Sequence, residues 1–523
     1  PVRRLPLKAF LRSLCVYALL LSSAFAIELP SKLDYTKLAS LPILEAGRYK
    51  PLEAYAGKTV ETITGRWNFE KKNPVGYVLA FLVSPEWANE ELILIDYRPL
   101  KEALGLDVDQ KRFSYNTLAA NAEFQRRSQS LMQRMQTVEE KDLTTLENRF
   151  ASVLHRMNLF SSMITGQDLT IVPAPSGSAD HAPWSSIIAP EGYGEEQVAA
   201  TKAAWNAVLT AFRNNDPAAF DTAAVQLKAQ MASLNPEMEL SPAMMEKEVK
   251  FYHSRPFLKS WIYYLVAFFA FLLAFQFRNK VTISIGCIAF ALGYFYNSYG
   301  FITRSIIAGH PSVSNMYESV IFVSFGLITI ALVFELIYRQ LWFVTAGSFF
   351  GVILIVMADL MPFDSNIDPL VPVLKSNYWL IVHEMTITLS YSAFALALGL
   401  AHIVLIMYFF RSKKEATIDT LSLFLYRVLQ VGIVLLAAGT ILGGVWAAES
   451  WGRFWGWDPK ETWSLISLLG YLAILHARYT NWLKNIGTAV CAVLGFWLIF
   501  ITWYGVNFIL STKLHSYKFN AGG

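Results

Sequence analysis

Tryptophans gather in one short stretch near the C-terminal end of the chain. Residues 451–463 read WGRFWGWDPKETW and contain four of them, Trp451, Trp455, Trp457 and Trp463. Indole faces stack on flat rings, and the neighbouring cations Arg453 and Lys460 can pair with anionic groups. The stretch therefore predicts a site for a flat, apolar ligand with acidic tails, for which heme is the obvious candidate. The alternative is an aromatic belt at a membrane surface, which needs no ligand.

The same stretch carries the signals that start a helix. Asp458 can cap a helix, Pro459 suits the first helical position, and Glu461 completes a capping box. These signals predict an indole-lined loop that leads into a helix beginning at Pro459. Asp458 and Glu461 also have the chemistry for proton transfer, although the pattern favours the capping role for Asp458.

Two histidines flank the tryptophan stretch in the sequence. His383 begins an apolar segment, and His515 follows the last one. Neutral imidazole is a good iron ligand, so both residues are candidates for the axial positions of heme iron. A third histidine, His476, lies thirteen residues into the apolar segment that begins at Trp463. An ionisable group inside a membrane indicates function, and the alternative is a neutral imidazole bonded to a neighbouring hydroxyl.

The composition is that of a membrane protein with a soluble part. Of the 523 residues, 54% are hydrophobic and 16% are charged, which indicates several membrane segments beside a region with its own core. The net charge of +4 is too small to indicate binding to nucleic acid. The three cysteines lie in apolar runs, and neither CxxC nor CxxCH occurs. The sequence therefore predicts no disulfide framework and no c-type heme carried by this chain.

Residues 1–27 combine a basic start, an apolar stretch and a small-residue end. This pattern is typical of a signal peptide or of an uncleaved transmembrane anchor whose basic end is cytoplasmic. We favour the anchor, because the sequence begins with Pro instead of Met and more chain is expected before it.

Residues 28–255 are predicted to form a mainly α-helical extracytoplasmic domain. Residues 115–165 read as one long amphipathic helix or a helix pair, and residues 166–192 as a loop rich in Pro, Ser and Gly. The sequence shows no nucleophile–base pair, phosphate loop or metal-ligand spacing in this region. Our hypothesis for the domain is a docking surface for a polypeptide. Further helices are expected over 53–64, 194–214, 217–233 and 241–254.

From residue 257 onward, apolar segments follow one another closely, each near or above the length that crosses a bilayer as a helix. Basic residues fall on alternate connections, which should be cytoplasmic, so the tryptophan stretch and the soluble domain should lie outside. We predict an all-α polytopic membrane protein with about nine transmembrane helices, its N-terminus inside and its C-terminus outside. After the first, the spans are expected over 257–277, 281–300, 316–338, 341–361, 380–410, 427–446, 463–481 and 486–510.

The stretch WGRFWGWDPKETWSLI resembles the WWD signature of heme-handling membrane proteins. From about residue 257 to the C-terminus, the chain resembles the CcsA (ResC) half of System II cytochrome c biogenesis proteins, and the preceding soluble part resembles the extracytoplasmic region of fused CcsB–CcsA synthases. Residues 256–523 are then a CcsA-like heme-handling domain with a WWD loop at 446–463. Further motifs that carry the resemblance are GHPSVSNMYES (309–319), HEMTITLSYSAF (from His383) and GVNFILSTKLHSY (505–517).

The resemblance implies roles for individual histidines. His383 and His515 match the two histidines that flank the WWD loop and hold heme iron. His476 matches the transmembrane histidine that binds heme on its way across the membrane, and its partner histidine belongs to the CcsB half. His310 falls in a family motif and is expected to support the site or the fold instead of binding iron.

The resemblance also implies a function, a cytochrome c synthase that is also a heme transporter. Heme b, as substrate and cofactor, would be carried to the external WWD site and joined through thioether bonds to the CxxCH cysteines of apocytochrome c. The implied partners are this apocytochrome, a CcsB/ResB-like half or N-terminal remainder, periplasmic thiol reductants and membrane lipid. The implied location is the bacterial inner membrane, with the active site on the periplasmic face.

Two other functions stay open on the residues alone. A heme delivery or export protein would pass heme to a partner without forming the covalent bond. A b-type heme electron carrier would need paired histidines within the bilayer core.

Overall fold

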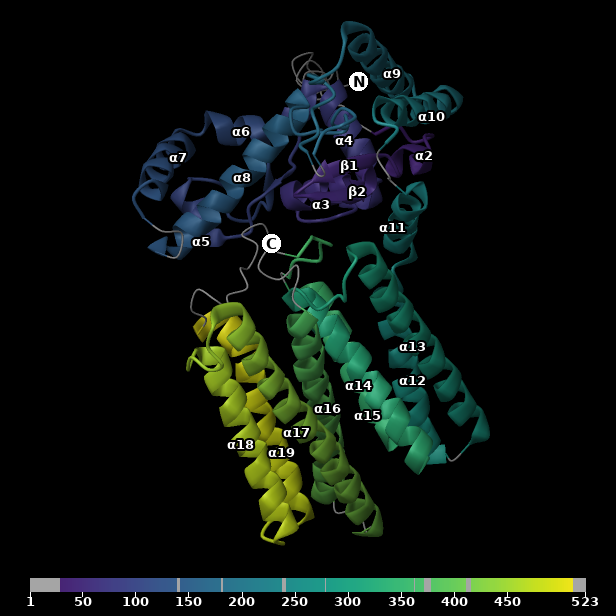
Figure 1. Cartoon of the computed structure of the whole chain (residues 1–523), viewed down its shortest axis with the longest axis vertical. Helices are drawn as coiled ribbons and strands as arrows, with labels where there is room; N and C mark the ends of the chain where they lie inside the picture. The colour runs from purple at the N-terminus through teal and green to yellow at the C-terminus, as the bar shows by residue number, and fades with distance from the viewer. Residues whose placement is uncertain are drawn as a thin grey trace, which may run out of the picture. The chain divides into compact units, whose positions relative to one another are not determined.

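The computed structural model describes residues 29–138, 142–179, 182–237, 241–277, 279–361, 363–370, 378–410 and 415–510. The chain divides into two compact units, with the boundary between Met245 and Glu246. The first keeps the name soluble unit from the expectation for residues 28–255, and the second, which holds the long apolar helices, is named the membrane unit. Figure 1 shows the helices and strands of both units.

The soluble unit is mainly helical, with two small antiparallel sheets. Strands β1 (Pro42–Glu45) and β2 (Arg48–Pro51) pair with each other, as do β3 (Ile93–Leu94) and β4 (Arg112–Phe113). Its helices are α2 (Thr36–Ala39), α3 (Leu52–Thr64), α4 (Pro74–Val83), α5 (Arg98–Ala103), α6 (Tyr115–Ala120), α7 (Ala122–Met135), α8 (Thr145–Thr165), α9 (Glu195–Arg213) and α10 (Pro217–Leu234).

Residues 115–165 form three helices, so the prediction of one helix or a pair was wrong in number. Local hydrogen bonds explain the breaks. The Ser114 hydroxyl accepts from the backbone N–H of Thr117 at the start of α6, and the Asn121 side chain caps α7. Thr144 and Glu147 form a complete capping box at the start of α8. Each cap satisfies N–H groups that a continuous helix would have bonded internally.

The core of the soluble unit is built around α3, α4 and α8. Phe81 of α4 and Phe160 of α8 meet edge to face, with their ring centroids 5.0 Å apart. Tyr77 and Trp87 extend this aromatic cluster. Such pairs combine apolar burial with the favourable edge-to-face geometry of aromatic rings. These aromatic contacts hold α4 and α8 together.

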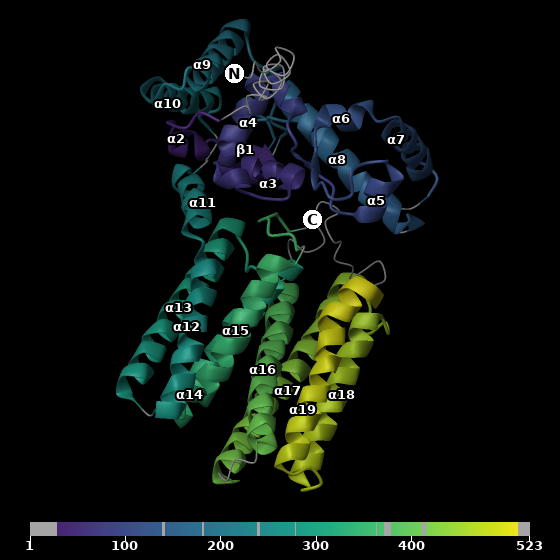
Figure 2. The ribbon, with the colours of Figure 1, turned by 180° about the vertical axis from the view of Figure 1, so that it is seen from behind.

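The membrane unit is a set of long apolar helices. Helix α11 (Pro242–Ser254) crosses the boundary between the units, and α12 begins directly after it at Pro256. In Figures 1 and 2, α12 and α13 lie side by side, as do α16 with α17 and α18 with α19. The helices are α12 (Pro256–Phe277), α13 (Lys280–Ala308), α14 (Met316–Tyr338), α15 (Trp342–Leu360), α16 (Tyr378–Phe409), α17 (Glu415–Trp451), α18 (Pro459–Tyr479) and α19 (Asn485–Phe500), followed by a π-helical turn at Ile501–Leu510.

Seven helices of the described residues are long and apolar enough to cross a membrane. This confirms the predicted class, an all-α polytopic membrane protein. Of the eight spans expected from residue 257 onward, the one over 463–481 is missing from these seven. It corresponds to α18, which is helical but less apolar because its first turn and its last turn are polar. The anchor predicted over residues 1–27 lies outside the described residues.

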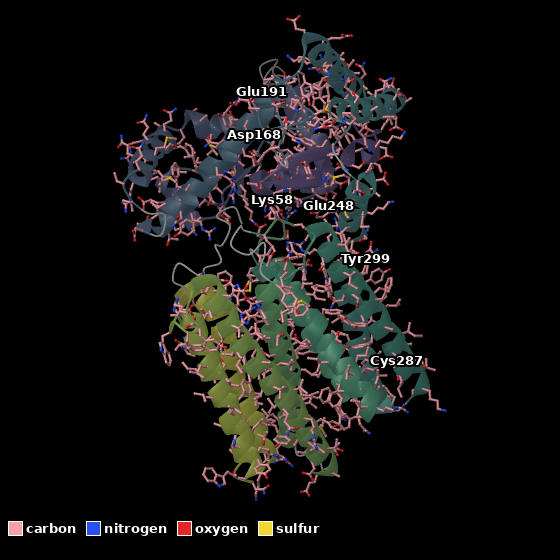
Figure 3. All side chains as sticks on the ribbon, viewed as in Figure 1. Lys58, Asp168, Glu191, Glu248, Cys287 and Tyr299 are labelled. Atoms are coloured by element: carbon pink, nitrogen blue, oxygen red, sulfur yellow. The ribbon has the colours of Figure 1, made fainter. Side chains whose placement is uncertain are left out.

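The outward faces of α12 and α13 carry many exposed apolar side chains, among them Phe269, Phe277 and Ile288. Cys287 and Tyr299 lie along α13 in Figure 3 and belong to the same apolar helix. Glycine allows α12 and α13 to pack closely. A methyl group at Gly293 of α13 would lie 2.6 Å from the ring of Tyr264 on α12, so a larger residue would not fit there. Exposed apolar surface of this extent fits helices that face lipid.

Candidate functional site

The tryptophan stretch links α17 to α18. Helix α17 continues to Trp451 and α18 starts at Pro459, so the irregular part of the predicted loop is residues 452–458. The backbone N–H of Glu461 donates to Asp458 Oδ1 at 2.8 Å, and Glu461 Oε2 accepts from the backbone N–H of Asp458 at 3.4 Å. The predicted start at Pro459 and the capping box are therefore confirmed. Glu461 Oε2 also accepts from the N–H of Gly456 at 2.6 Å, which ties the loop to the helix start.

Trp457 has a backbone conformation that is rare for a bulky residue. Its φ is +56°, in the left-handed region, and the residue is 69% exposed. Its ring meets that of Trp455 edge-on at 5.9 Å between centroids. A non-glycine residue held at positive φ costs free energy and marks strain that the surroundings must maintain.

A small cavity of about 50 Å³, the tryptophan cavity, lies between α16, α17, the loop and α18. It collects four of the predicted site residues, His383, Trp451, Trp455 and Lys460. The other residues predicted at the site and described by the structure lie outside its lining, including Trp457, Trp463 and Arg453. The remaining lining residues are Ile387, Tyr391, Thr440, Gly443, Gly444, Trp446, Ala447, Glu461, Ser464 and Thr502.

His383 presents a defined ring nitrogen at this cavity. Its Nδ1 lies 2.7 Å from the carbonyl oxygen of Gly439 on α17. A carbonyl oxygen can only accept, so Nδ1 carries the hydrogen and the neutral ring has its lone pair on Nε2. The residue is 8% exposed, and its ring is nearly parallel to that of Trp446, at 6.5 Å between centroids. The arrangement prepares Nε2 as the nitrogen that can bind a metal.

Glycines on α17 allow α16 to approach this closely. A methyl group at Gly439 would lie 2.9 Å from Ile387 Cα, and one at Gly443 would lie 2.7 Å from His383 Cε1. These glycines are spaced four residues apart and share one helix face, a small-residue pattern typical of close helix pairs in membranes. Neither glycine was predicted from the sequence, nor was Trp446, and the four-residue spacing is the signal from which the glycines could have been found.

Charged groups meet at the edge of the cavity. Lys460 Nζ lies 3.4 Å from Glu384 Oε1, which is also 4.0 Å from His383 Nε2. Glu384 was not predicted from the sequence. It follows His383 directly in α16, and only the packing shows that its carboxylate lies near Lys460 and His383. The pair places one cation within reach of an anionic ligand while balancing it with a carboxylate. The Arg453 guanidinium lies instead against Gly456, since a methyl group there would fall 0.9 Å from its Nη1.

Two indole N–H groups at the site are buried and find no acceptor among the residues that the structure describes. They belong to Trp446 and Trp455. Trp446 also meets Trp451 edge-on at 4.5 Å between ring centroids. Buried donors nearly always have partners, so these two N–H groups are free to donate to acceptors of a ligand if the indoles move apart.

The remaining predicted histidines lie apart from this cavity. His476 is exposed on α18, and its Nδ1 lies 2.8 Å from the carbonyl oxygen of Leu472, one turn earlier. His310 Nδ1 lies 3.0 Å from the carbonyl oxygen of Pro311 in the turn after α13. His515 lies outside the described residues. The described geometry therefore places one predicted iron ligand, His383, at the tryptophan cavity.

Comparison with known proteins identifies the family. Residues 313–514 match the family described as cytochrome C assembly protein. The chain is 34% identical to the cytochrome c biogenesis protein CcsA of Guillardia theta, over 46% of this chain and 96% of that relative. The chain belongs to the CcsA family. CcsA of Thermosynechococcus vestitus is 35% identical, over 41% of this chain and 81% of its own length.

A longer relative extends the similarity to the soluble unit. Protein NrfI of Wolinella succinogenes is 29% identical over 90% of this chain, and the chain spans about half (53%) of the length of NrfI. CcsA family membership and the apolar helices together establish a multi-pass membrane protein of cytochrome c biogenesis.

Proposed function

We propose that this chain holds heme as a substrate at the tryptophan cavity and attaches it to the CxxCH cysteines of an apocytochrome c. The observation that carries the proposal is His383, whose Nδ1 is fixed by the Gly439 carbonyl so that Nε2 carries the lone pair that binds iron. Hydrogen bonding of the second ring nitrogen is the usual means by which proteins orient a metal-binding histidine. Indoles suited to a porphyrin and a cation suited to its propionates line the same cavity.

The cavity is too small for a porphyrin as it stands. Its volume is about 50 Å³, whereas ligand sites commonly measure about 300–1,000 Å³. Heme binding thus requires the indoles to separate, and residues 452–458 are the segment whose movement would do this. Irregular backbone and the strained Trp457 support a loop with a second conformation. Separation would also expose the two buried indole N–H groups to acceptors on the ligand.

The attachment chemistry needs no covalent intermediate with this chain. Each cysteine S–H adds across one vinyl group, forming a C–S bond at one carbon while the hydrogen goes to the other. The chain contributes placement, and oriented reactants reach effective molarities of about 10⁵–10⁸ M. His383 and, by the family resemblance, His515 would hold the iron until the CxxCH histidine displaces one of them. Asp458, which caps α18, is assigned a structural role, with proton transfer as a further candidate.

The other parts of the proposal follow the resemblance. His476 would receive heme on the cytoplasmic side, with a partner histidine from a CcsB/ResB-like half. Its exposed position on α18 leaves room for such a partner. The tryptophan cavity would face the periplasm of the bacterial inner membrane, where thiol reductants keep the acceptor cysteines reduced. The soluble unit would receive the apocytochrome.

Co-expression with a c-type apocytochrome tests this function. We expect heme to stay on the acceptor in a denaturing gel, and His383→Ala to abolish that signal while the protein still accumulates in the membrane. Added imidazole should partly restore heme absorbance in His383→Ala, because it replaces the missing ligand. His402→Ala is the matched control, since His402 is exposed on the same helix and its Nδ1 bonds the backbone carbonyl oxygen of Leu398, one turn earlier, at 2.8 Å.

Two outcomes would contradict the proposal. Heme bound by the chain but never joined to the acceptor would favour the delivery protein over the synthase. Unchanged heme absorbance in His383→Ala would show that His383 does not bind the iron, and the proposed heme site at the tryptophan cavity would then be wrong.

A further inference from the structure

Lys460 is a cation at a position where the helix backbone favours an anion. It is the second residue of α18, in the same turn as the capping box of Asp458 and Glu461. The partial positive charge at the N-terminus of a helix stabilises acidic side chains and destabilises basic ones. The charge of Lys460 therefore does not help to start α18, and its position indicates pairing with an anion outside the helix.

Glu384 of α16 supplies that anion. Its Oε1 lies 3.4 Å from Lys460 Nζ, and the side chains of Glu384 and Lys460 are 14% and 17% exposed. Water and salt screen an ion pair at this degree of burial less than a pair on the open surface. A ligand that pairs with Lys460 must consequently displace the Glu384 carboxylate or bind with a second carboxylate close to it.

The two members of the pair differ in their relation to the tryptophan cavity. Lys460 lines the cavity, whereas Glu384 does not. Glu384 Oε1 is also 4.0 Å from His383 Nε2, the nitrogen assigned to iron. This distance is too long for a hydrogen bond, and a carboxylate and a ring lone pair are both acceptors. Glu384 therefore does not hold His383 in place, and its effect on the cavity is expected through Lys460.

We propose that Glu384 competes with a heme propionate for Lys460 and so limits how tightly the tryptophan cavity holds heme. This inference rests on the proposed function and concerns the same site. In the empty cavity, Glu384 neutralises Lys460. When heme enters, a propionate pairs with Lys460, and two carboxylates beside one ammonium group repel each other. The affinity for heme is lowered by the free energy that separates Glu384 from Lys460.

Limited affinity suits a protein that passes its substrate on. Heme that has been joined to an acceptor must leave the cavity, and binding that stabilises every state equally does not accelerate the reaction. As the propionate leaves, Glu384 pairs with Lys460 again. Glu384 thus acts on heme binding and release, and no covalent step is assigned to it.

The test compares heme with heme dimethyl ester, whose propionates carry no charge, in titrations of the purified full chain followed by absorbance. Glu384→Gln removes the competing charge and keeps the size of the side chain. We expect this variant to bind heme about three- to tenfold more tightly than the unmodified chain, the range for loss of one partly buried ion pair. Both proteins should bind the ester equally, which also shows that the variant is folded.

Two further variants isolate the effect. Glu449→Gln is the matched control, because Glu449 is exposed near the end of α17 and does not line the cavity, so the same charge is lost elsewhere. It should bind heme as the unmodified chain does. In a Lys460→Met background, the gain from Glu384→Gln should shrink, because the cation for which the carboxylates compete is absent.

Three results would overturn the inference: equal or weaker heme binding by Glu384→Gln, an equal gain for the ester, or an undiminished gain in the Lys460→Met background. Each leaves the proposed function intact as long as His383→Ala loses heme. Heme absorbance that persists in His383→Ala would instead overturn the proposed function, and no heme binding by the unmodified chain would overturn both.

Discussion

The Nδ1 atom of His383 lies 2.7 Å from the carbonyl oxygen of Gly439, across the contact between α16 and α17. This one hydrogen bond selects the ring tautomer and leaves the lone pair on Nε2 of a residue that lines the tryptophan cavity. It also depends on the glycine, because the carbonyl reaches the ring only when the two helices nearly touch. The orientation of the proposed iron ligand is thus set by a residue that has no side chain.

Gly439→Ala is expected to abolish heme absorbance although His383 is still present. The added methyl group would lie 2.9 Å from Ile387 Cα, and backbone cannot yield there as a flexible side chain could, so α16 and α17 must separate. The measurement is the heme absorption spectrum of the purified protein. Gly470→Ala serves as the control, since its methyl group would meet the flexible end of Leu498 on α19. A normal spectrum in Gly439→Ala would show that the carbonyl does not orient His383.

The parts of the site that could be predicted from the sequence are those encoded locally. The Asp458 cap and the start of α18 follow from three neighbouring residues, because a capping box is completed within one turn. The contact of His383 with Gly439 joins residues 56 positions apart and depends on how two helices pack, which no local pattern states. Likewise, tryptophan density pointed to the stretch, yet packing alone decided that Trp455 lines the cavity and that Trp457 faces outward.

A buried ion pair joins three segments of the membrane unit. Arg304 of α13 and Glu318 of α14 lie 2.9 Å apart with both side chains 2% exposed. Arg304 also donates to the carbonyl oxygens of Ser365 and Asn366, at 2.9 and 2.5 Å, and so holds residues 363–370. The Ser314 hydroxyl and N–H donate to the same Glu318.

Removing one partner of this pair should destabilise the unit strongly. Arg304→Met leaves the Glu318 carboxylate buried without its cation, for which the expected cost is about 3–5 kcal/mol. Thermal unfolding of the purified protein in detergent would detect this loss. The double variant Arg304→Met with Glu318→Leu should recover part of it, because no buried charge then remains. Equal stability of the single and double variants would mean that the charges themselves contribute little.

The capping box of α8 should make the start of that helix sensitive to acid. Hydrogen bonds from the Thr144 hydroxyl and then from its backbone N–H lower the pKa of Glu147 below its usual value. A carboxylate with a lowered folded pKa contributes stability above its unfolded pKa, and this contribution is lost as the pH falls through the folded value. Hydrogen-exchange protection at residues 145–150 should therefore drop in acid. Glu147→Gln should abolish this pH dependence, and Thr144→Ala should cost about 1 kcal/mol at neutral pH.

Substitutions of Trp457 can separate the backbone strain at this residue from a role of its indole in heme binding. Trp457→Gly should leave thermal stability unchanged or raise it, because glycine adopts the observed φ of +56° without steric cost. If the loop opens to let heme in and this indole then covers the porphyrin, the same variant should bind heme more weakly. Trp457→Phe, which keeps an aromatic ring and the strained backbone, should retain most of the binding and show no gain in stability. Heme titration followed by absorbance would compare the heme affinities of the unmodified protein, Trp457→Gly and Trp457→Phe. Equal affinities for all three would show that the Trp457 indole does not contact heme and belongs to the aromatic belt at the membrane surface.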